Sequence, residues 1–214
     1  DHTPSRSELS LPKHGFVFCG INNSYKISPS EFDIWMRLLK NIDGSVLWLL
    51  ESNEWVKKNL CREAVNRGIS SDRLVFTYRV TKEKYLAQFR QADLFLDTFT
   101  YNAGATASNA LWAGLPVLTK LGKSYTARMA GSLLTSLGLP DLITKSELEY
   151  EELALQLGTD SKRLSAIRQR LSDNRLSKPL FNTELFTKHL EEGYRQAYQN
   201  YLDYEKPKII YVKP

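Results

Sequence analysis

The chain has 214 residues, of which 42% are hydrophobic and 25% charged, and its formal net charge at pH 7 is +5. This length and composition suit one large α/β domain with a helical appendage. No apolar run reaches the roughly 18–20 residues that cross a bilayer, and the lysines and arginines are dispersed rather than clustered with aromatic residues. We therefore expect no membrane span and no nucleic-acid partner.

Cysteine and histidine usage argues against a disulfide scaffold and against a metal site. The two cysteines, Cys19 and Cys61, cannot define a disulfide framework, so we expect reduced thiols in a cytoplasmic protein. The three histidines are scattered without metal-ligand spacing. The polar start, residues 1–14, has no signal-peptide pattern and is typical of a segment that enters from a preceding domain.

Short apolar runs alternate with helical segments from residue 16 onward, and glycines or polar loops separate them. This alternation, with short connections, predicts a doubly wound parallel sheet of the Rossmann-like class, in which ligands bind at the carboxyl ends of the strands. The predicted strands are 16–19, 45–50, 74–76, 94–96 and 116–118, with 142–143 as a candidate edge strand, and the predicted helices are 29–42, 54–66, 82–90, 107–112 and 124–137.

Two of these elements carry local signals of their own. Ser28 is a candidate N-cap for the first helix, with Pro29 at the first helical position and Glu31 at the N3 position of a capping box. Residues 45–50 are almost all apolar, which is typical of a strand covered by helices on both faces. We therefore expect Trp48 to be buried in a central strand.

The stretch from Leu94 to Thr119 is the most informative part of the chain. It consists of an apolar run that ends at Asp97, a loop of small and polar residues, a short helix and a second apolar run, which together form a βαβ pattern. The small-residue loop leads into a helix N-terminus, where free N–H groups and the helix dipole suit a phosphate. Small residues would equally allow the helix to pack closely on the sheet, and the pattern leaves both interpretations open.

Beyond residue 146 the sequence predicts helices alone, at 147–157, 161–174 and 183–204. The last of them is long and rich in tyrosine, and it either packs back on its own domain or crosses to another one. We therefore divide the chain into a sheet domain, residues 1–145, and a helical extension, residues 146–214.

Several segments in fixed order resemble one known family, and the resemblance runs from about Ser5 to Tyr201. The segments are FCGINNSYKISPSEFDIWMRLLKNIDGSVLWLL, LFLDTFTYNAGATASNALWAGLPVLT, LGTDSKRL and PLFNTELFTKHLEEGYRQAY. They are similar to the C-terminal half of the catalytic region of the O-linked N-acetylglucosamine transferases (glycosyltransferase family 41), which include the SPINDLY-like members.

The resemblance implies a two-lobed GT-B architecture, of which this chain would be the C-terminal lobe. That lobe binds the UDP of a UDP-GlcNAc-like donor without a metal ion or other cofactor, and the sugar passes to Ser or Thr of a protein acceptor. Members usually carry tetratricopeptide (TPR) repeats and an N-terminal catalytic lobe ahead of this one. The lobe by itself is therefore expected to be inactive in transfer.

The resemblance also implies roles for individual residues. Lys26 matches the lysine that contacts the donor diphosphate and is required for activity, and a cation there would offset charge on the departing diphosphate. Asn23 occupies the place of a donor-contacting Gln. Val80, Thr81 and Lys82 fall where the family contacts the uracil.

Other positions depart from the family pattern. Where the family has a His-Thr-Thr run, this chain has Gly104, Ala105 and Thr106, and only Thr106 keeps its hydroxyl. The other departures are Asn109 in place of a ribose-binding acidic residue, Tyr85 in place of a His and Gln88 in place of an Arg. Loss of these contacts would weaken donor binding or favour another nucleotide sugar. The alternative hypothesis is a degenerate, non-catalytic member that serves as a binding or scaffolding module.

Overall fold

The computed structural model describes residues 3–212 and contains a six-stranded, all-parallel sheet. The order of its strands, β3-β2-β1-β4-β5-β6, confirms the predicted doubly wound fold. The strands are β1 (Val17–Gly20), β2 (Val46–Leu50), β3 (Leu74–Thr77), β4 (Leu94–Leu96), β5 (Val117–Lys120) and β6 (Ile143–Thr144).

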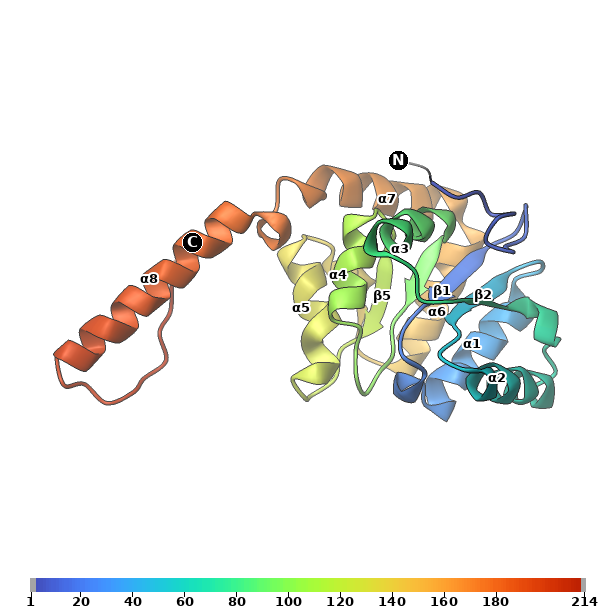
Figure 1. The fold of residues 1–214 in the computed structure, drawn as a ribbon, viewed down its shortest axis with the longest axis horizontal. Helices are drawn as coiled ribbons and strands as arrows, with labels where there is room; N and C mark the ends of the chain where they lie inside the picture. Colours follow the sequence, from blue (N-terminus) through green and yellow to red (C-terminus); the bar gives the residue numbers. More distant parts are fainter. Residues whose placement is uncertain (1–2, 213–214) are drawn as a thin grey trace.

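Helices cover both faces of this sheet (Figure 1). Because parallel crossovers are right-handed and the chain winds outward from β1 in both directions, α1 and α2 lie on one face and α3, α4 and α5 on the other. The helix α6 returns to pack beside α1. Their bounds are α1 (Pro29–Asn41), α2 (Glu54–Asn66), α3 (Lys82–Gln88), α4 (Ala105–Trp112), α5 (Met129–Ser136), α6 (Glu147–Thr159), α7 (Ser161–Arg175) and α8 (Thr183–Leu202).

The core lies between the sheet and these two helical layers. The β2 strand occupies an interior position between β1 and β3, and Trp48 in it is fully buried, as predicted. Its indole Nε1 has no hydrogen-bond partner among the described residues. Burial on both faces explains why this strand is almost wholly apolar.

Two helices near the small-residue loop differ from their predicted bounds. The α4 helix begins at Ala105 rather than Ala107, so more of the loop belongs to its first turn. The predicted helix 124–137 is wrong in its first part, where a 3-10 turn (Thr126–Arg128) precedes α5. Backbone bonding explains the interruption, because the Thr126 carbonyl accepts from the Asn102 N–H across the loop.

The predicted capping box at the start of α1 is also wrong. The Ser28 side chain makes no capping bond to the helix backbone, although Pro29 does begin the helix. Instead, the Ser28 hydroxyl donates to the Glu31 carboxylate. That carboxylate is fully buried and also accepts hydrogen bonds from the Ser30 hydroxyl, at 3.2 Å, and from the Phe99 N–H of the β4–α4 loop, at 3.1 Å.

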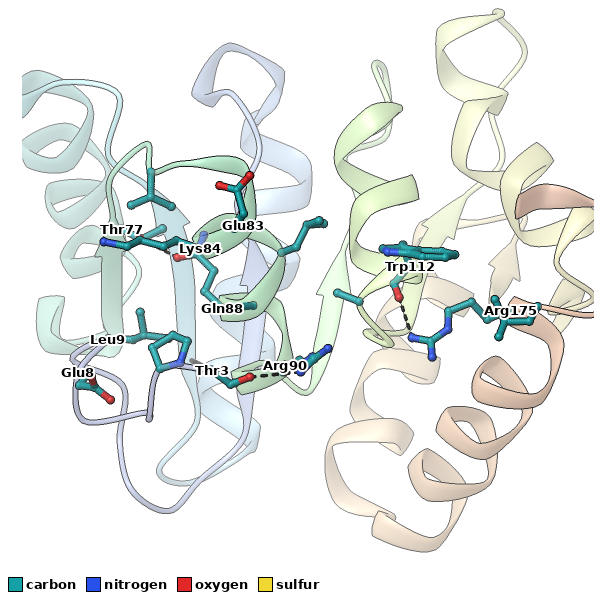
Figure 2. Close-up of a pocket in the computed structure, with 16 residues that line it drawn as sticks. Thr3, Glu8, Leu9, Thr77, Glu83, Lys84, Gln88, Arg90, Trp112 and Arg175 are labelled. Atoms are coloured by element: carbon teal, nitrogen blue, oxygen red, sulfur yellow. Dashed lines mark hydrogen bonds between the residues drawn. The ribbon is translucent and has the colours of Figure 1, made fainter. Parts of the chain in front are cut away.

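A groove of about 810 Å³ lies on the outer side of α3. Figure 2 shows α3 and the N-terminal segment on one side of it and the end of α4 with the end of α7 on the other. Most of its lining is apolar. Its polar side chains include Thr77 and Gln88 on one side and Arg175 on the other.

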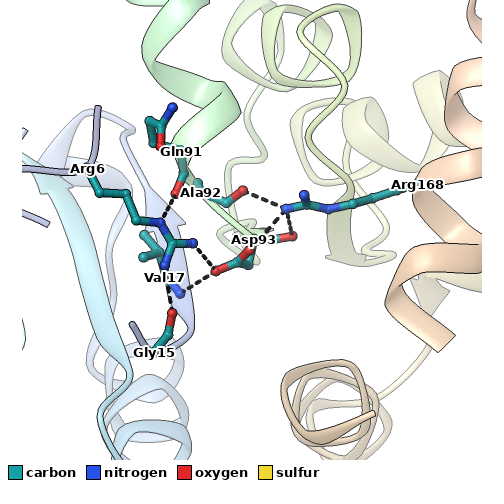
Figure 3. A network of polar contacts seen from close by, with 7 residues as sticks. All are labelled: Arg6, Gly15, Val17, Gln91, Ala92, Asp93 and Arg168. Atoms are coloured by element: carbon teal, nitrogen blue, oxygen red, sulfur yellow. Dashed lines mark hydrogen bonds and ion pairs between the residues drawn. The ribbon is translucent and has the colours of Figure 1, made fainter. Parts of the chain in front are cut away.

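Asp93, which directly precedes β4, links several elements at the amino ends of the central strands through hydrogen bonds and ion pairs (Figure 3). One carboxylate oxygen accepts from the Arg6 guanidinium at 2.8 Å and from the Val17 N–H at 2.8 Å. The other accepts from Arg168 of α7 at 3.2 Å. One partly buried acid therefore joins the N-terminal segment, β1, β4 and α7 at the end of the sheet opposite to the ligand-binding end.

The last helix, α8, leaves the body of the lobe (Figure 1). Its exposed face carries a stripe of large apolar side chains at helical spacing: Phe186, Leu190, Tyr194, Tyr198 and Tyr201. Among residues 3–212, no helix is both long and apolar enough to span a membrane. The stripe therefore belongs to a helix that is amphipathic and lacks a covering partner within the described chain.

Candidate functional site

The predicted site residues gather where β1 and β4 lie side by side. The chain winds away from these two strands in opposite directions, so their carboxyl ends form the switch point at which doubly wound folds bind ligands. The loop after β1 contains Lys26, in a 3-10 turn (Ser24–Lys26) that the sequence did not predict. The loop after β4 leads into α4. A hydrogen bond of 3.0 Å from Lys26 Nζ to the Asn102 carbonyl joins the two loops.

The Lys26 ammonium group is partly shielded from solvent at this point. It lies 3.9 Å from the centre of the Tyr101 ring, a cation–π contact. Burial lowers the pKa of Lys26, while the nearby Asp97 carboxyl opposes this shift. Within residues 3–212 the amine has one carbonyl acceptor and no carboxylate in a salt bridge, so much of its charge is available to an anion.

Asp97, which the sequence analysis had noted only as the end of a strand, is fully buried beneath the β4–α4 loop. Its Oδ1 accepts from the Ala103 N–H at 2.7 Å, and its Oδ2 accepts from the Thr119 hydroxyl at 2.6 Å. Burial raises the pKa of Asp97 to about 7, although these hydrogen bonds and the Lys26 charge act in the opposite direction. A polar residue that ends a buried strand is the signal that could have identified it.

The first turn of α4 presents its free backbone N–H groups at the same end of the sheet. Gly104 is the N-cap residue, and Ala105 and Thr106 follow it in the first turn. The N–H groups of this turn have no intrahelical acceptor and carry the positive end of the helix dipole. Asn109 is half-buried one turn later, and its side chain makes no hydrogen bond to any described residue.

On the α3 side, the structure shows the contacts of two residues that depart from the family pattern, Tyr85 and Gln88. The Tyr85 side chain is hydrogen-bonded to Thr106, which connects α3 to the start of α4, and burial raises the pKa of Tyr85 to about 12. Gln88 is buried and its Oε1 accepts from the Thr77 hydroxyl at 3.4 Å. Its Nε2 has no partner among the described residues, although the side chain lines the groove of Figure 2.

The other predicted residues lie around the rim. Asn23 accepts a hydrogen bond of 2.9 Å from Arg79, a residue that the sequence analysis missed, and this bond ties the loop after β1 to the loop after β3. Val80 is exposed and lines the groove, and Thr81 is the N-cap residue of α3. Lys82 is exposed in the first turn of that helix. Val80, Thr81 and Lys82 lie on the α3 side of the site, whereas the Asn23 carbonyl accepts a hydrogen bond of 3.0 Å from the Lys26 N–H.

The chain matches one protein family over most of its length. The model of Glycosyl transferase family 41 matches residues 2–190. A UDP-N-acetylglucosamine–peptide N-acetylglucosaminyltransferase of Caenorhabditis elegans is 34% identical over 92% of this chain and 17% of that protein. A probable enzyme of the same description from Arabidopsis thaliana, SEC, is 32% identical over 98% of this chain and 22% of that protein. The chain thus spans about a fifth of the length of these relatives.

Solved structures agree with these matches. A mutant O-GlcNAc transferase of Thermobaculum terrenum superposes with a TM-score of 0.81 at 31% identity, covering 87% of this chain and 36% of that one. The C-terminal domain of a group 1 glycosyl transferase of Francisella tularensis superposes with a TM-score of 0.60 at 15% identity. The second likeness concerns the fold alone, and both place the sheet described above among the Rossmann-like lobes of the GT-B fold.

Proposed function

Because the chain belongs to glycosyl transferase family 41, we propose that it forms the nucleotide-sugar-binding lobe of a protein O-glycosyltransferase. The donor is a UDP-GlcNAc-like nucleotide sugar, and the acceptor is a Ser or Thr hydroxyl of a protein. The convergence of Lys26 Nζ with the N-terminal turn of α4, at the switch point between β1 and β4, supports this proposal most strongly.

This arrangement suits a leaving diphosphate. As the bond from the sugar to the diphosphate breaks, negative charge accumulates on the β-phosphate. The Lys26 ammonium group and the free N–H groups of Gly104, Ala105 and Thr106 would stabilise that charge. We propose that these groups take the place that a metal ion has in other transferases, so that donor binding is metal-independent.

The α3 side suits the nucleoside. The unpartnered Nε2 of Gln88 is a buried donor without an acceptor, which is costly unless a ligand provides one, and a uracil carbonyl is such an acceptor. Val80, Thr81 and Lys82 would surround the base, and Asn23 and Tyr85 would border it. Asn109, half-buried in α4, would lie beside the ribose hydroxyls.

The rest of the catalytic machinery belongs to other parts of the same polypeptide in this proposal. We propose that an N-terminal lobe supplies the acceptor groove and the proton relay, that TPR repeats precede it, and that the parent protein is cytoplasmic. The exposed apolar stripe of α8 supports a facing partner, since contiguous exposed apolar patches mark interaction surfaces. The division of the chain at residue 145 stays a prediction, and its outermost residues, 1–2 and 213–214, lie outside the described part.

Calorimetric titration of the chain with UDP tests the proposal. We expect saturable binding that Lys26→Ala abolishes, because that substitution removes the ammonium group that is hydrogen-bonded to the β4–α4 loop. Lys13→Ala, which removes an exposed lysine of the N-terminal segment, is the matched control and should bind as the parent does. No binding at millimolar UDP would favour the alternative, a non-catalytic scaffolding module.

A further inference from the structure

The backbone of the β4–α4 loop, residues 98–104, is held by hydrogen bonds from side chains. Its carbonyl oxygens accept hydrogen bonds from the protein itself. Thr98 O accepts from the Asn102 side chain at 2.6 Å, and Tyr101 O accepts from the Thr98 hydroxyl at 2.7 Å. Asn102 O accepts from Lys26 at 3.0 Å. The negative ends of these peptide dipoles are therefore already engaged and do not oppose an incoming anion.

Two N–H groups of the same loop are bonded to buried carboxyl groups from different elements. The Ala103 N–H donates to Asp97 at 2.7 Å, just before the N-terminal turn of α4. The Phe99 N–H donates to Glu31 of α1 at 3.1 Å, near the other end of the loop. Both acids are fully buried and neither forms a salt bridge with a described residue. Burying a carboxyl group costs free energy, and the hydrogen bonds that each acid accepts offset part of this cost.

We propose that Asp97 and Glu31 are positioning residues, which clamp the two ends of the β4–α4 loop so that Lys26 and the N–H groups at the start of α4 face a bound diphosphate. This inference rests on the proposed function, because the ligand is the diphosphate of the proposed donor. Neither acid touches that ligand; both act through the backbone of the loop.

The clamp at Asp97 has an electrostatic consequence. The charged or titratable groups that face Asp97 are Lys26 from the loop after β1 and Tyr150 from α6, whose hydroxyl donates to the Asp97 carbonyl. Glu31 from α1 also acts electrostatically on this tyrosine. Of these, only Lys26 favours an ionised Asp97. A diphosphate bound above the loop would pair with the same lysine and repel an ionised Asp97, which raises the pKa of that carboxyl group. Binding should therefore be accompanied by proton uptake at Asp97.

The test compares the removal of the hydrogen bonds with the removal of the charge alone. In Asp97→Asn, the amide oxygen can still accept from Ala103 and the amide nitrogen can donate to Thr119, whereas Asp97→Ala loses both bonds. UDP-GlcNAc is the titrant, because both phosphates of its diphosphate diester stay ionised and do not titrate near neutral pH. We expect Asp97→Ala to weaken its binding about tenfold or more, and Asp97→Asn to stay within about threefold of the parent near pH 6.

A pH profile separates positioning from a merely structural role. Parent affinity should fall as the pH rises from about 6 to about 8, with proton uptake visible as a buffer-dependent binding enthalpy, whereas Asp97→Asn should show neither effect. Thr144→Val, which removes a buried hydroxyl bonded to the Thr119 carbonyl rather than to the loop, is the control and should behave as the parent does. If Asp97→Ala does not fold, Glu31→Ala against Glu31→Gln makes the same comparison at the Phe99 N–H.

Two outcomes would overturn the inference: parent-like affinity in a folded Asp97→Ala or Glu31→Ala variant, or an Asp97→Asn variant that retains the pH dependence of the parent. Amide hydrogen exchange without ligand distinguishes this failure from that of the proposed function. If the parent binds no donor while the Ala103 amide is protected and loses protection in Asp97→Ala, the clamp exists and the proposed ligand is wrong. If that amide is unprotected in the parent, the clamp itself is wrong.

Discussion

Asp97 is a buried carboxyl group that accepts hydrogen bonds at both oxygens, and even so burial raises its pKa from 3.8 to about 7. The folded chain therefore holds a proton at this position, between about pH 4 and pH 7, that the unfolded chain has released. Through this group, stability is highest below the unfolded pKa and is lost as the pH rises through the folded pKa.

We accordingly predict that Asp97→Asn gains stability relative to the parent as the pH rises. Since each unit of pKa shift corresponds to about 1.4 kcal/mol, the difference in unfolding free energy should change by as much as about 4 kcal/mol between pH 4 and pH 8. Urea denaturation of both proteins at a series of pH values measures it. Parallel stability curves for parent and variant would contradict the assignment of the proton to Asp97.

Asn109 is a second single residue for which we predict an effect, in this case on the affinity of the proposed site for UDP. A carboxylate in its place could accept from both ribose hydroxyls, whereas the amide has to orient its oxygen. We predict that Asn109→Asp tightens UDP binding by about 1 kcal/mol, as a neutral hydrogen bond becomes charge-assisted. Calorimetry at matched salt measures the change, and equal or weaker affinity would mean that Asn109 does not face the ribose.

At the scale of elements, β2 shows how burial and hydrogen bonding compete within one strand. Trp48 is fully buried, so Trp48→Ala should destabilise the fold by about 3–5 kcal/mol. Trp48→Phe should cost much less, because it keeps an aromatic ring and removes an Nε1 donor that has no partner among the described residues. Thermal and urea unfolding of the two variants compare these costs. Coincident melts of parent and Trp48→Ala would contradict the role of β2 in the core.

The helices α7 and α8 follow each other in sequence but differ in their relation to the lobe. Three α7 side chains, Leu164, Ile167 and Leu171, are buried, and Arg168 is bonded to Asp93 at the end of the sheet. In contrast, α8 has no buried residue. Of the two outcomes that the sequence left open for the last helix, the structure shows that it does not pack back on the sheet.

At the scale of the whole molecule, the chain is in our proposal one half of a two-lobed cleft. It would supply the diphosphate side, whereas the acceptor side would belong to the proposed N-terminal lobe. We predict that the isolated chain binds UDP but transfers no sugar to a protein acceptor, and that the N-terminal lobe added in trans or in cis restores transfer. A radiolabel transfer assay measures this. Robust turnover by the chain alone would contradict the two-lobe proposal.

The sequence by itself determined the features that depend on local pattern. Alternating apolar runs and helical segments were sufficient for the doubly wound sheet, the burial of Trp48 and the position of the small-residue loop, because periodicity and glycine placement act over a few neighbouring residues. The motifs around Lys26 and Gly104 also indicated the family.

Only the tertiary structure decided how the site is held together. Glu31 was expected to cap its own helix, but it bonds to the Phe99 N–H, 68 residues away in the chain. The bond between Lys26 and Asn102 spans 76 residues, and the pair of Arg79 and Asn23 spans 56. Such partners have no local signature, since they meet only when the parallel strands assemble and bring separate loops to the same end of the sheet.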